Sequence, residues 1–422
     1  MSRSGTPRAG WAVNLRVLTV EATHGTPLYA GLLMLAVSAV AAASLTSISP
    51  GWAGPLSNGA ATAVFLAPIT AGAAVVHVQM RGRKGWLDAA ASTPRGRAGA
   101  LALSFASLFA VAGFALLAGT AVALTRADLD GAFTPAMLVL PGMALTMCAA
   151  GAATGVLLGD RTQWRLAGPT IAIALYAVGI SWIFLRIQGR SWLLWLEPFP
   201  LDFFYSASTE PNTDLWLPKI VALGAVTVAV LLWLHRSRVL GGVVMAAGAT
   251  CLAVAAALLP PEVVRLRTPP DDPPCLEQSG VTVCTWPEST EPAPDILAAA
   301  LEVRETNERI LPSLPDTYVQ RGLETDSPGA AVVDILAVED PRAIISEVRQ
   351  SSLPTSGCSD LVAADELRDG VVRLMIARAG EPLLDDPQIE ALVRTNDENQ
   401  AAWVVDRLAD AEALCDQPRD NT

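Results

Sequence analysis

The residues that most often carry out catalysis or bind metals are few in this chain. Its three histidines are His24, His77 and His235, and none follows residue 262. The sequence after residue 262 therefore cannot form a histidine-based zinc site, a Ser-His-Asp triad or a Cys-His pair. The His-Glu-x-x-His motif, the glycine-rich phosphate loop and the acidic calcium loop are also absent. We expect no catalytic residue, no metal and no cofactor in this chain.

The six cysteines fall into two groups. Cys148 and Cys251 lie inside apolar stretches, where a thiol behaves as a small hydrophobic group. The other four, Cys275, Cys284, Cys358 and Cys415, lie in the C-terminal part of the chain, which we expect on the outer side of a membrane. An even number of cysteines there suggests two disulfides. Of three possible pairings we favour Cys275–Cys284, which would close a hairpin, and Cys358–Cys415, which would join the last helix to the domain. The alternatives are four free buried thiols and a four-cysteine zinc site, which the irregular spacing disfavours.

Seven apolar stretches are each long enough to cross a bilayer, whose core of about 30 Å needs roughly 20 helical residues. Six hold no charged side chain, and the other holds Lys219 near its start, where a long stem can reach the membrane surface. Their many Gly and Ala residues suit close helix packing in lipid. They predict an α-helical polytopic membrane bundle of six to seven spans, at 27–46, 59–80, 98–125, 132–159, 167–185, 215–234 and 239–261.

Charge divides the chain into two parts. Of the 41 acidic and 29 basic residues, 31 acidic and 13 basic lie from Val263 onward. This asymmetry predicts two domains in two environments. We expect a cytoplasmic amphipathic segment (1–26), a transmembrane domain (27–262), a linker (263–274) and an α-rich α+β soluble domain (275–422). The acidic domain is unsuited to nucleic acid, which requires basic side chains.

Loop charge predicts the orientation. With the N-terminus in the cytoplasm, twelve basic residues fall in cytoplasmic segments and four in external loops, as the positive-inside rule requires. Seven spans then place the C-terminal domain outside the plasma membrane. Arg265 and Arg267, just after the last span, count mildly against this orientation.

Two further segments have an amphipathic or aromatic character. Trp11, Leu15, Leu18 and Ala22 share one helical face and suggest a helix lying on the inner membrane surface, although a frayed tail is an alternative. Aromatic residues gather before the sixth span and predict an interfacial or shallow re-entrant segment, or equally a loop packed on the external domain. These aromatic residues are Trp192, Trp195, Phe199, Phe203, Phe204 and Trp216.

The membrane half resembles permease subunits of type-2 ABC transporters in their actinobacterial form, over about residues 10–240. The resemblance lies in the amphipathic segment 11–21, in the basic loop 81–97 with its Ser-Thr-Pro-Arg ending, and in the aromatic segment before the sixth span. It implies a separate cytoplasmic ATPase subunit and a homodimer or heterodimer of permeases. In that family the loop contacts the ATPase, which implies this role for Arg81, Arg83, Lys84, Trp86, Pro94 and Arg95.

The seventh span and the external domain depart from the family pattern, since the plain permease has six spans and ends inside. The basic loop has a simpler interpretation as the positive-inside charges of a short connection. Two main hypotheses therefore stand. One is a permease subunit, with export as the family's default direction, and the other is a membrane-anchored sensor or scaffold that acts through its acidic external domain. A membrane enzyme is the weakest hypothesis, because the sequence offers no set of residues suited to acid–base catalysis or metal binding.

Overall fold

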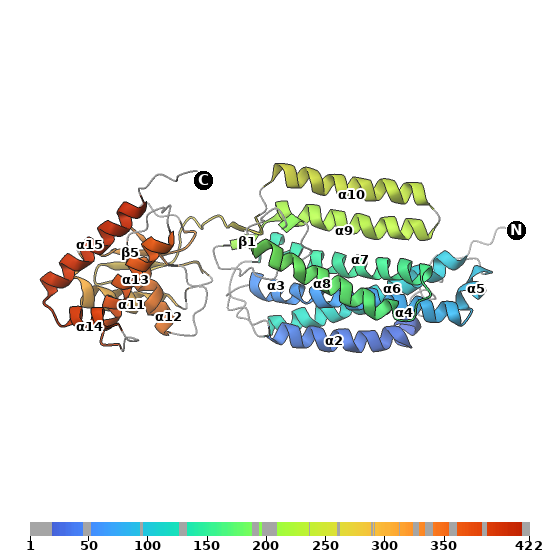
Figure 1. The fold of residues 1–422 in the computed structure, drawn as a ribbon, viewed down its shortest axis with the longest axis horizontal. Helices are drawn as coiled ribbons and strands as arrows, with labels where there is room; N and C mark the ends of the chain where they lie inside the picture. Colours follow the sequence, from blue (N-terminus) through green and yellow to red (C-terminus); the bar gives the residue numbers. More distant parts are fainter. Residues whose placement is uncertain are drawn as a thin grey trace. The chain divides into compact units, whose positions relative to one another are not determined.

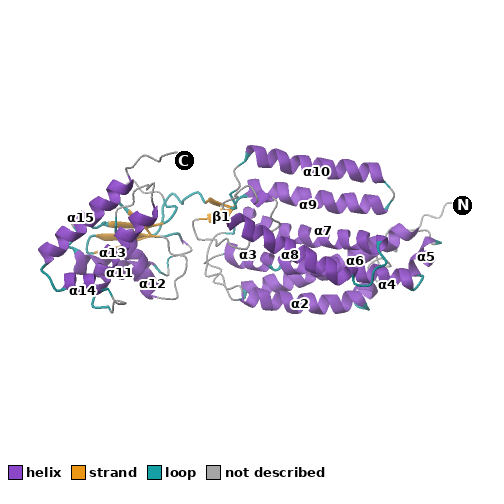
Figure 2. Ribbon diagram, viewed as in Figure 1, coloured by secondary structure: helices purple, strands orange, loops and turns teal. Residues whose placement is uncertain are grey.

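The computed structural model describes residues 19–44, 52–92, 96–125, 133–187, 194–195, 209–235, 237–259, 262–287, 290, 292–311, 313–323, 329–333, 341–353, 361–381 and 386–415, with backbone alone at 182–187, 341–343, 361–364 and 415. The chain forms two compact units. The membrane unit, Met1–Tyr205 with Glu210–Arg265, is a bundle of long helices, and the C-terminal unit, Ser206–Thr209 with Leu266–Thr422, combines strands and helices (Figures 1 and 2).

Six helical segments in the described part of the chain are long and apolar enough to cross a membrane. A further helix, α8 (Ala167–Ile187), coincides with the predicted stretch 167–185, and its apolar side chains are described as far as Ser181. The prediction of a helical membrane bundle is therefore confirmed. The six segments are α2 (Thr26–Ser44), α3 (Ala53–Ala61) with α4 (Ala63–Arg83), α6 (Gly96–Leu124), η1 (Pro135–Leu138) with α7 (Val139–Arg161), α9 (Thr213–Leu234) and α10 (Arg238–Leu258).

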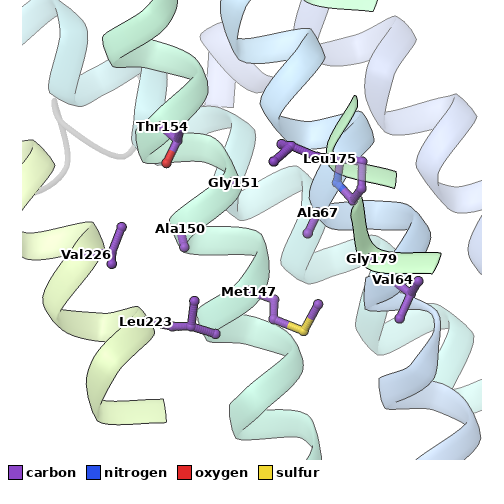
Figure 3. Close-up of a pocket in the computed structure, with 11 residues that line it drawn as sticks. Val64, Ala67, Met147, Ala150, Gly151, Thr154, Leu175, Gly179, Leu223 and Val226 are labelled. Atoms are coloured by element: carbon purple, nitrogen blue, oxygen red, sulfur yellow. The ribbon is translucent and has the colours of Figure 1, made fainter. Parts of the chain in front are cut away.

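Helices α4 and α7 lie at the centre of the membrane unit and approach each other at their backbones. Gly151, Gly155 and Gly159 are spaced four residues apart on the face of α7 that meets α4. Figure 3 shows Gly151 on α7 and Ala67 of the neighbouring α4. A Cβ atom at Gly155 would lie 2.3 Å from the Ala71 carbonyl oxygen, and one at Gly151 would lie 2.6 Å from that of Ala67. Glycine is therefore required here, and the contact gives van der Waals packing that lipid cannot supply.

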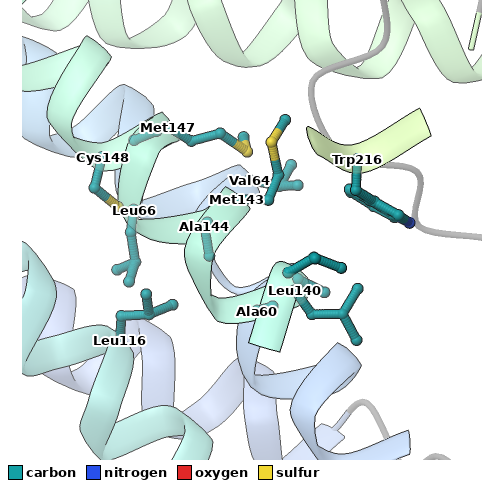
Figure 4. Close-up of a cluster of buried hydrophobic side chains, with 14 of the residues drawn as sticks. Ala60, Val64, Leu66, Leu116, Leu140, Met143, Ala144, Met147, Cys148 and Trp216 are labelled. Carbon is teal, nitrogen blue, oxygen red and sulfur yellow. The ribbon is translucent and has the colours of Figure 1, made fainter. Parts of the chain in front are cut away.

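A buried apolar cluster extends this contact to the neighbouring helices. Leu66 of α4 and Leu116 of α6 meet Leu140 and Met143 of α7, and Trp216 of α9 closes the same cluster (Figure 4). Lipid tails are as apolar as these side chains, so their close packing, rather than exclusion of water, holds the helices together. The cluster fixes α6 and α9 on the α4–α7 pair.

The C-terminal unit is an α+β fold built on a four-stranded sheet in the order β3-β4-β5-β6. The β3–β4 pair is antiparallel, and the β4–β5 and β5–β6 pairs are parallel. The helices match the predicted ones, but the strand pair expected at 281–286 lies earlier, and β5 was not predicted. The elements are β3 (Cys275–Gln278), β4 (Val281–Cys284), α11 (Ala293–Asn307), β5 (Thr317–Gln320), β6 (Ala331–Val333), α12 (Pro341–Ser351), α13 (Leu361–Arg378), α14 (Pro387–Val393) and α15 (Asp397–Cys415).

The β3–β4 hairpin explains the first cysteine pair. Ser279 and Gly280 both have positive φ, which is the backbone of the tight two-residue turn that suits twisted antiparallel strands. This turn places Cys275 directly opposite Cys284, with their Cα atoms 4.1 Å apart, and the two form a disulfide. The predicted Cys275–Cys284 bond is confirmed. Cys358, and the side chain of Cys415, lie outside the described residues, so their pairing stays a prediction.

Arg378 ties three helices of the C-terminal unit together. Its Nε donates to the Thr306 carbonyl at the end of α11, at 3.1 Å, and its Nη1 donates to the Asp397 carboxylate at the start of α15, at 2.8 Å. The hydrogen bond from Arg378 holds the pKa of the Asp397 carboxyl below its ordinary value. The unit thus has its own polar connections as well as its own apolar core, which includes Ile296, Tyr318 and Val404.

Replacement of Gly155 by alanine is expected to destabilise the membrane unit by about 1–3 kcal/mol, because the added methyl group overpacks against the α4 backbone. Gly142→Ala on the same helix is the matched control, since a Cβ there meets only Ile220 at an ordinary 3.7 Å. Unfolding in detergent, followed by circular dichroism, measures both. Equal stabilities for the two variants would contradict a backbone contact at Gly155.

Peptide mapping of the non-reduced protein is expected to recover Cys275 linked to Cys284, because the hairpin register already sets the two thiols face to face. Reduction should release the two peptides. The buried Cys148 should remain an unlinked thiol in the same digest and serves as the internal control. Recovery of Cys275 in a bond with any other cysteine would overturn the assigned pair.

Candidate functional site: the basic end of the bundle

One end of the membrane unit gathers most of its described basic side chains, and we call it the basic end (residues 19–24, 80–92, 96–97, 160–167, 235 and 237–238). The Gln79 amide donates to the carbonyls of Thr162 and Trp164, at 3.1 and 3.0 Å, which brings the end of α4 beside the α7–α8 connection. Arg97 at the start of α6 pairs with Asp160 at the end of α7, at 2.7 Å. Four helix termini therefore meet at this end.

Arg81 is turned inward at the basic end. Its guanidinium donates to the Glu21 carboxylate and, at 3.1 Å, to the Ser104 hydroxyl of α6, and its side chain is only 15% exposed. His77, one turn earlier on α4, is buried with its Nε2 3.8 Å from the same carboxylate. Arg81 therefore fastens the segment before α2 to α4 and α6, rather than lying on an outer surface as the family resemblance implies.

The loop after α4 forms an exposed platform, which we define as Arg83, Lys84, Trp86 and Asp88. Gly85 has a φ of 69°, a left-handed conformation that reverses the chain and starts the short helix α5 (Trp86–Ala91). Trp86 is 63% exposed, and the other three side chains are also exposed. Arg83 additionally donates to the Gln163 carbonyl, at 3.2 Å.

The platform is anchored to the bundle from beneath. Leu87 of α5 is buried in a cluster with Val78 of α4 and Leu101 of α6. Arg97 lies 3.6 Å from Asp88 as well as 2.7 Å from Asp160, so α5 is also linked to α6 and α7 by charge. A force applied to α5 would therefore reach α4 and α6 directly. Pro94 and Arg95, the remaining predicted contact residues, lie outside the described residues.

The described aromatic residues before the sixth span are buried rather than interfacial. Trp216 is 1% exposed, and its indole N–H donates to the Val263 carbonyl at 3.1 Å. Trp195 is also buried. Lys219, expected to reach the membrane surface, is 3% exposed and donates to the Leu194 carbonyl at 2.7 Å, with the Trp216 ring 5.4 Å away. Trp192, Phe199, Phe203 and Phe204 lie outside the described residues.

A second feature, which we call the wedge cavity, lies within the helices and has a volume of about 240 Å³. Thr154 is the one polar side chain among the described residues that line it. The small residues of these helices indicate close packing but do not by themselves indicate a cavity. The one sequence signal for it is Pro68, in the middle of an apolar stretch. The lining residues are Val64, Ala67, Pro68, Met147, Ala150, Gly151, Thr154, Leu175, Gly179, Leu223 and Val226 (Figure 3).

No group of three His, Cys, Asp or Glu side chains lies close enough to hold a metal ion within the part of the chain that the structure describes. Comparisons with protein-family models, with curated proteins and with solved structures find no match to this chain.

Glu21→Gln is expected to lower the free energy of unfolding by about 2 kcal/mol, because it leaves the largely buried Arg81 without its anionic partner. Arg81→Gln should cost less in the Glu21→Gln background than alone, as coupled residues require. Asp88→Asn is the control: Asp88 is exposed at the same end, and its loss should change stability by less than about 0.5 kcal/mol. Denaturant unfolding in detergent distinguishes these outcomes, and additive effects of Glu21 and Arg81 would contradict the pairing.

Proposed function

We propose that this chain is a membrane-spanning permease subunit of an ATP-driven transporter of the ABC class, in which a separate cytoplasmic ATPase binds the exposed platform. The observation that carries the proposal is the platform itself: an exposed tryptophan at the start of the short helix α5, next to the exposed Arg83 and Lys84 at the end of α4. Tryptophan and arginine are the residues that contribute most to protein–protein binding. The chain has no phosphate loop of its own, so a partner would supply the energy.

The packing beneath the platform supports transmission of movement to the helices. Displacement of α5 would act on α4 through Leu87 and Val78. Because α4 and α7 touch at their backbones, the two would move as one body. The start of helix α8 packs closely on α4, where a Cβ on Gly72 would lie 2.8 Å from the Gly168 carbonyl oxygen. A change of tilt in α8 about this point would open or close the wedge cavity.

The path of the chain supports the proposed orientation. Helix α8 begins beside Gln79 at the basic end. By Leu194 the chain is next to Lys219, near the start of α9 at the opposite end. Under this proposal helix α8 would be a seventh crossing, and the C-terminal unit would then lie on the side opposite the N-terminus. The exposed basic residues at the basic end, which include Arg161, Arg165 and Arg238, favour the cytoplasm.

The competing function, a membrane-anchored sensor or scaffold, draws on the C-terminal unit. This unit has a complete core and a disulfide of its own, as an independently acting external domain requires. Under that function the platform would be an ordinary basic loop, and its charges would be dispensable. The proposed permease would work as a homodimer or heterodimer, whereas a sensor needs no second permease.

The decisive experiment is affinity purification of the tagged chain from its native membrane, followed by mass spectrometry. A stoichiometric P-loop ATPase is expected to accompany the wild-type chain. The double variant Arg83→Glu with Trp86→Ala should reduce ATPase recovery by at least about tenfold, since loss of one interface hot spot costs about 2 kcal/mol or more. Trp164→Ala with Arg165→Glu is the matched control, because it makes the same two changes at exposed positions of the same end.

Two outcomes would overturn the proposal. Absence of any ATPase under gentle detergent, with an envelope protein recovered instead, would assign function to the C-terminal unit. Equal loss of the ATPase in both double variants would show that the overall charge of the basic end, rather than the platform, governs recovery.

A further inference from the structure

The wedge cavity lies at the depth of the bilayer core. At a rise of about 1.5 Å per residue, Leu175 and Gly179 lie about 12 and 18 Å along α8 from its start at the basic end. On α9, Val226 and Leu223 lie about 12 and 16 Å from the end of the helix at the same side. These depths fall near the middle of a hydrocarbon core of about 30 Å. The medium around the cavity is therefore hydrocarbon rather than water.

The cavity communicates with the membrane-facing surface of the bundle. Leu175 lines it and is also 40% exposed, on the same helix as the exposed Ile173 and Val178. Figure 3 shows Leu175 and Gly179 of α8 on one side, Leu223 and Val226 of α9 on the other, and α7 between them. Its floor is formed by the rigid α4–α7 pair, and its walls are formed by helices that pack on this pair separately. Access from the bilayer is therefore lateral.

The chemistry of the lining selects an apolar occupant. No charged side chain and a single hydroxyl, that of Thr154, lie among the described lining residues. A polar or charged ligand would leave its groups unpaired there, which is costly in an apolar site. Apolar cavities of this kind exclude water and bind hydrocarbon, because an unfilled cavity forfeits the van der Waals contacts of its walls.

We propose that the wedge cavity binds the acyl chain of a membrane lipid, which enters between α8 and α9 and fills the space above the α4–α7 pair. The continuity of the cavity with the lipid-facing surface, its depth and its lining identify the lipid chain as the occupant. This inference depends on the membrane bundle alone and goes beyond the proposed ATPase partnership. The acyl chain would fill the space between α8, which packs on α4, and α9, which packs on α7.

Gly179 offers a direct test, because a Cβ there meets no atom within 4 Å although the residue lines the cavity. The first atom of a leucine side chain at Gly179 therefore meets no obstacle, and we expect Gly179→Leu to occupy part of the cavity. Gly242→Leu is the matched control: Gly242 is an exposed helical glycine of α10 with the same open space around its Cβ. Native mass spectrometry and lipid analysis of the purified chain, without ATPase or ATP, would compare lipid retention.

Wild type and Gly242→Leu are expected to retain a tightly bound lipid that Gly179→Leu loses in large part, because the added side chain takes the place of chain carbons and of their van der Waals contacts with the cavity walls. Equal retention by all three proteins would overturn the proposal. So would loss of a dimer in Gly179→Leu with lipid retention unchanged, because the cavity would then belong to an interface between two copies.

A second measurement needs no variant. Wild-type protein is placed in vesicles that contain phosphatidylglycerol with a diazirine at mid-chain. The vesicles are irradiated, and the labelled peptides are sequenced. Labelling of α8 and α9 around Leu175 and Leu223 above the level on the exposed face of α10 is expected. Uniform labelling of all exposed helix faces would refute a specific lipid site. These readouts are independent of ATPase recovery, so this proposal and the proposed function can fail separately.

Discussion

The backbone contact between α4 and α7 is the constraint on which the membrane unit depends. Three glycines at four-residue spacing allow the helices to approach until a single added methyl group would meet a carbonyl oxygen of α4. In lipid, where burial of apolar surface gives no advantage over contact with the bilayer, such close approach is a main source of helix association. The α4–α7 pair is therefore the part of the bundle least free to deform.

The platform and the wedge cavity both lie on this pair. At its basic end, the Glu21–Arg81 pair and the Leu87 cluster attach the platform and the segment before α2 to α4. Further along, Ala67 of α4 and Gly151 of α7 line the wedge cavity between α8 and α9. The same two helices therefore connect both features, so a displacement at the platform would be passed along them toward the cavity.

The sequence predicted the features that depend on composition and local pattern. Apolar length located the helices, because backbone groups in lipid must be satisfied within the helix itself. The Cys275–Cys284 pair was predicted from spacing, since a two-residue turn fixes which residues face each other. The Gly151-x-x-x-Gly155-x-x-x-Gly159 pattern is visible in the sequence and indicates close helix packing. The sequence alone does not show that α4 is the helix packed against it.

The features that the sequence missed arise from contacts between distant segments. In the sequence Arg81 resembles any basic residue of an exposed loop. Its side chain nevertheless points into the bundle, because Glu21, sixty residues earlier, lies beside it. Lys219 and Trp216 have the pattern of membrane-surface residues, but Leu194 and Val263 supply carbonyl acceptors that let both be buried. Strand β5 has only four residues, and its pairing in parallel with β4 and β6 depends on a crossover that no local pattern reveals.

The acidic C-terminal unit requires an environment different from that of the bundle. Arg349 within it is buried, and its charge is balanced by Glu302 and Glu381, at 3.4 and 2.6 Å. Exposed carboxylates elsewhere on the unit need water, so it cannot share the hydrocarbon phase with the helices. Its first sheet hairpin is closed by a disulfide, which persists outside the reducing cytoplasm. The disulfide and the exposed carboxylates therefore set this unit apart from the apolar bundle.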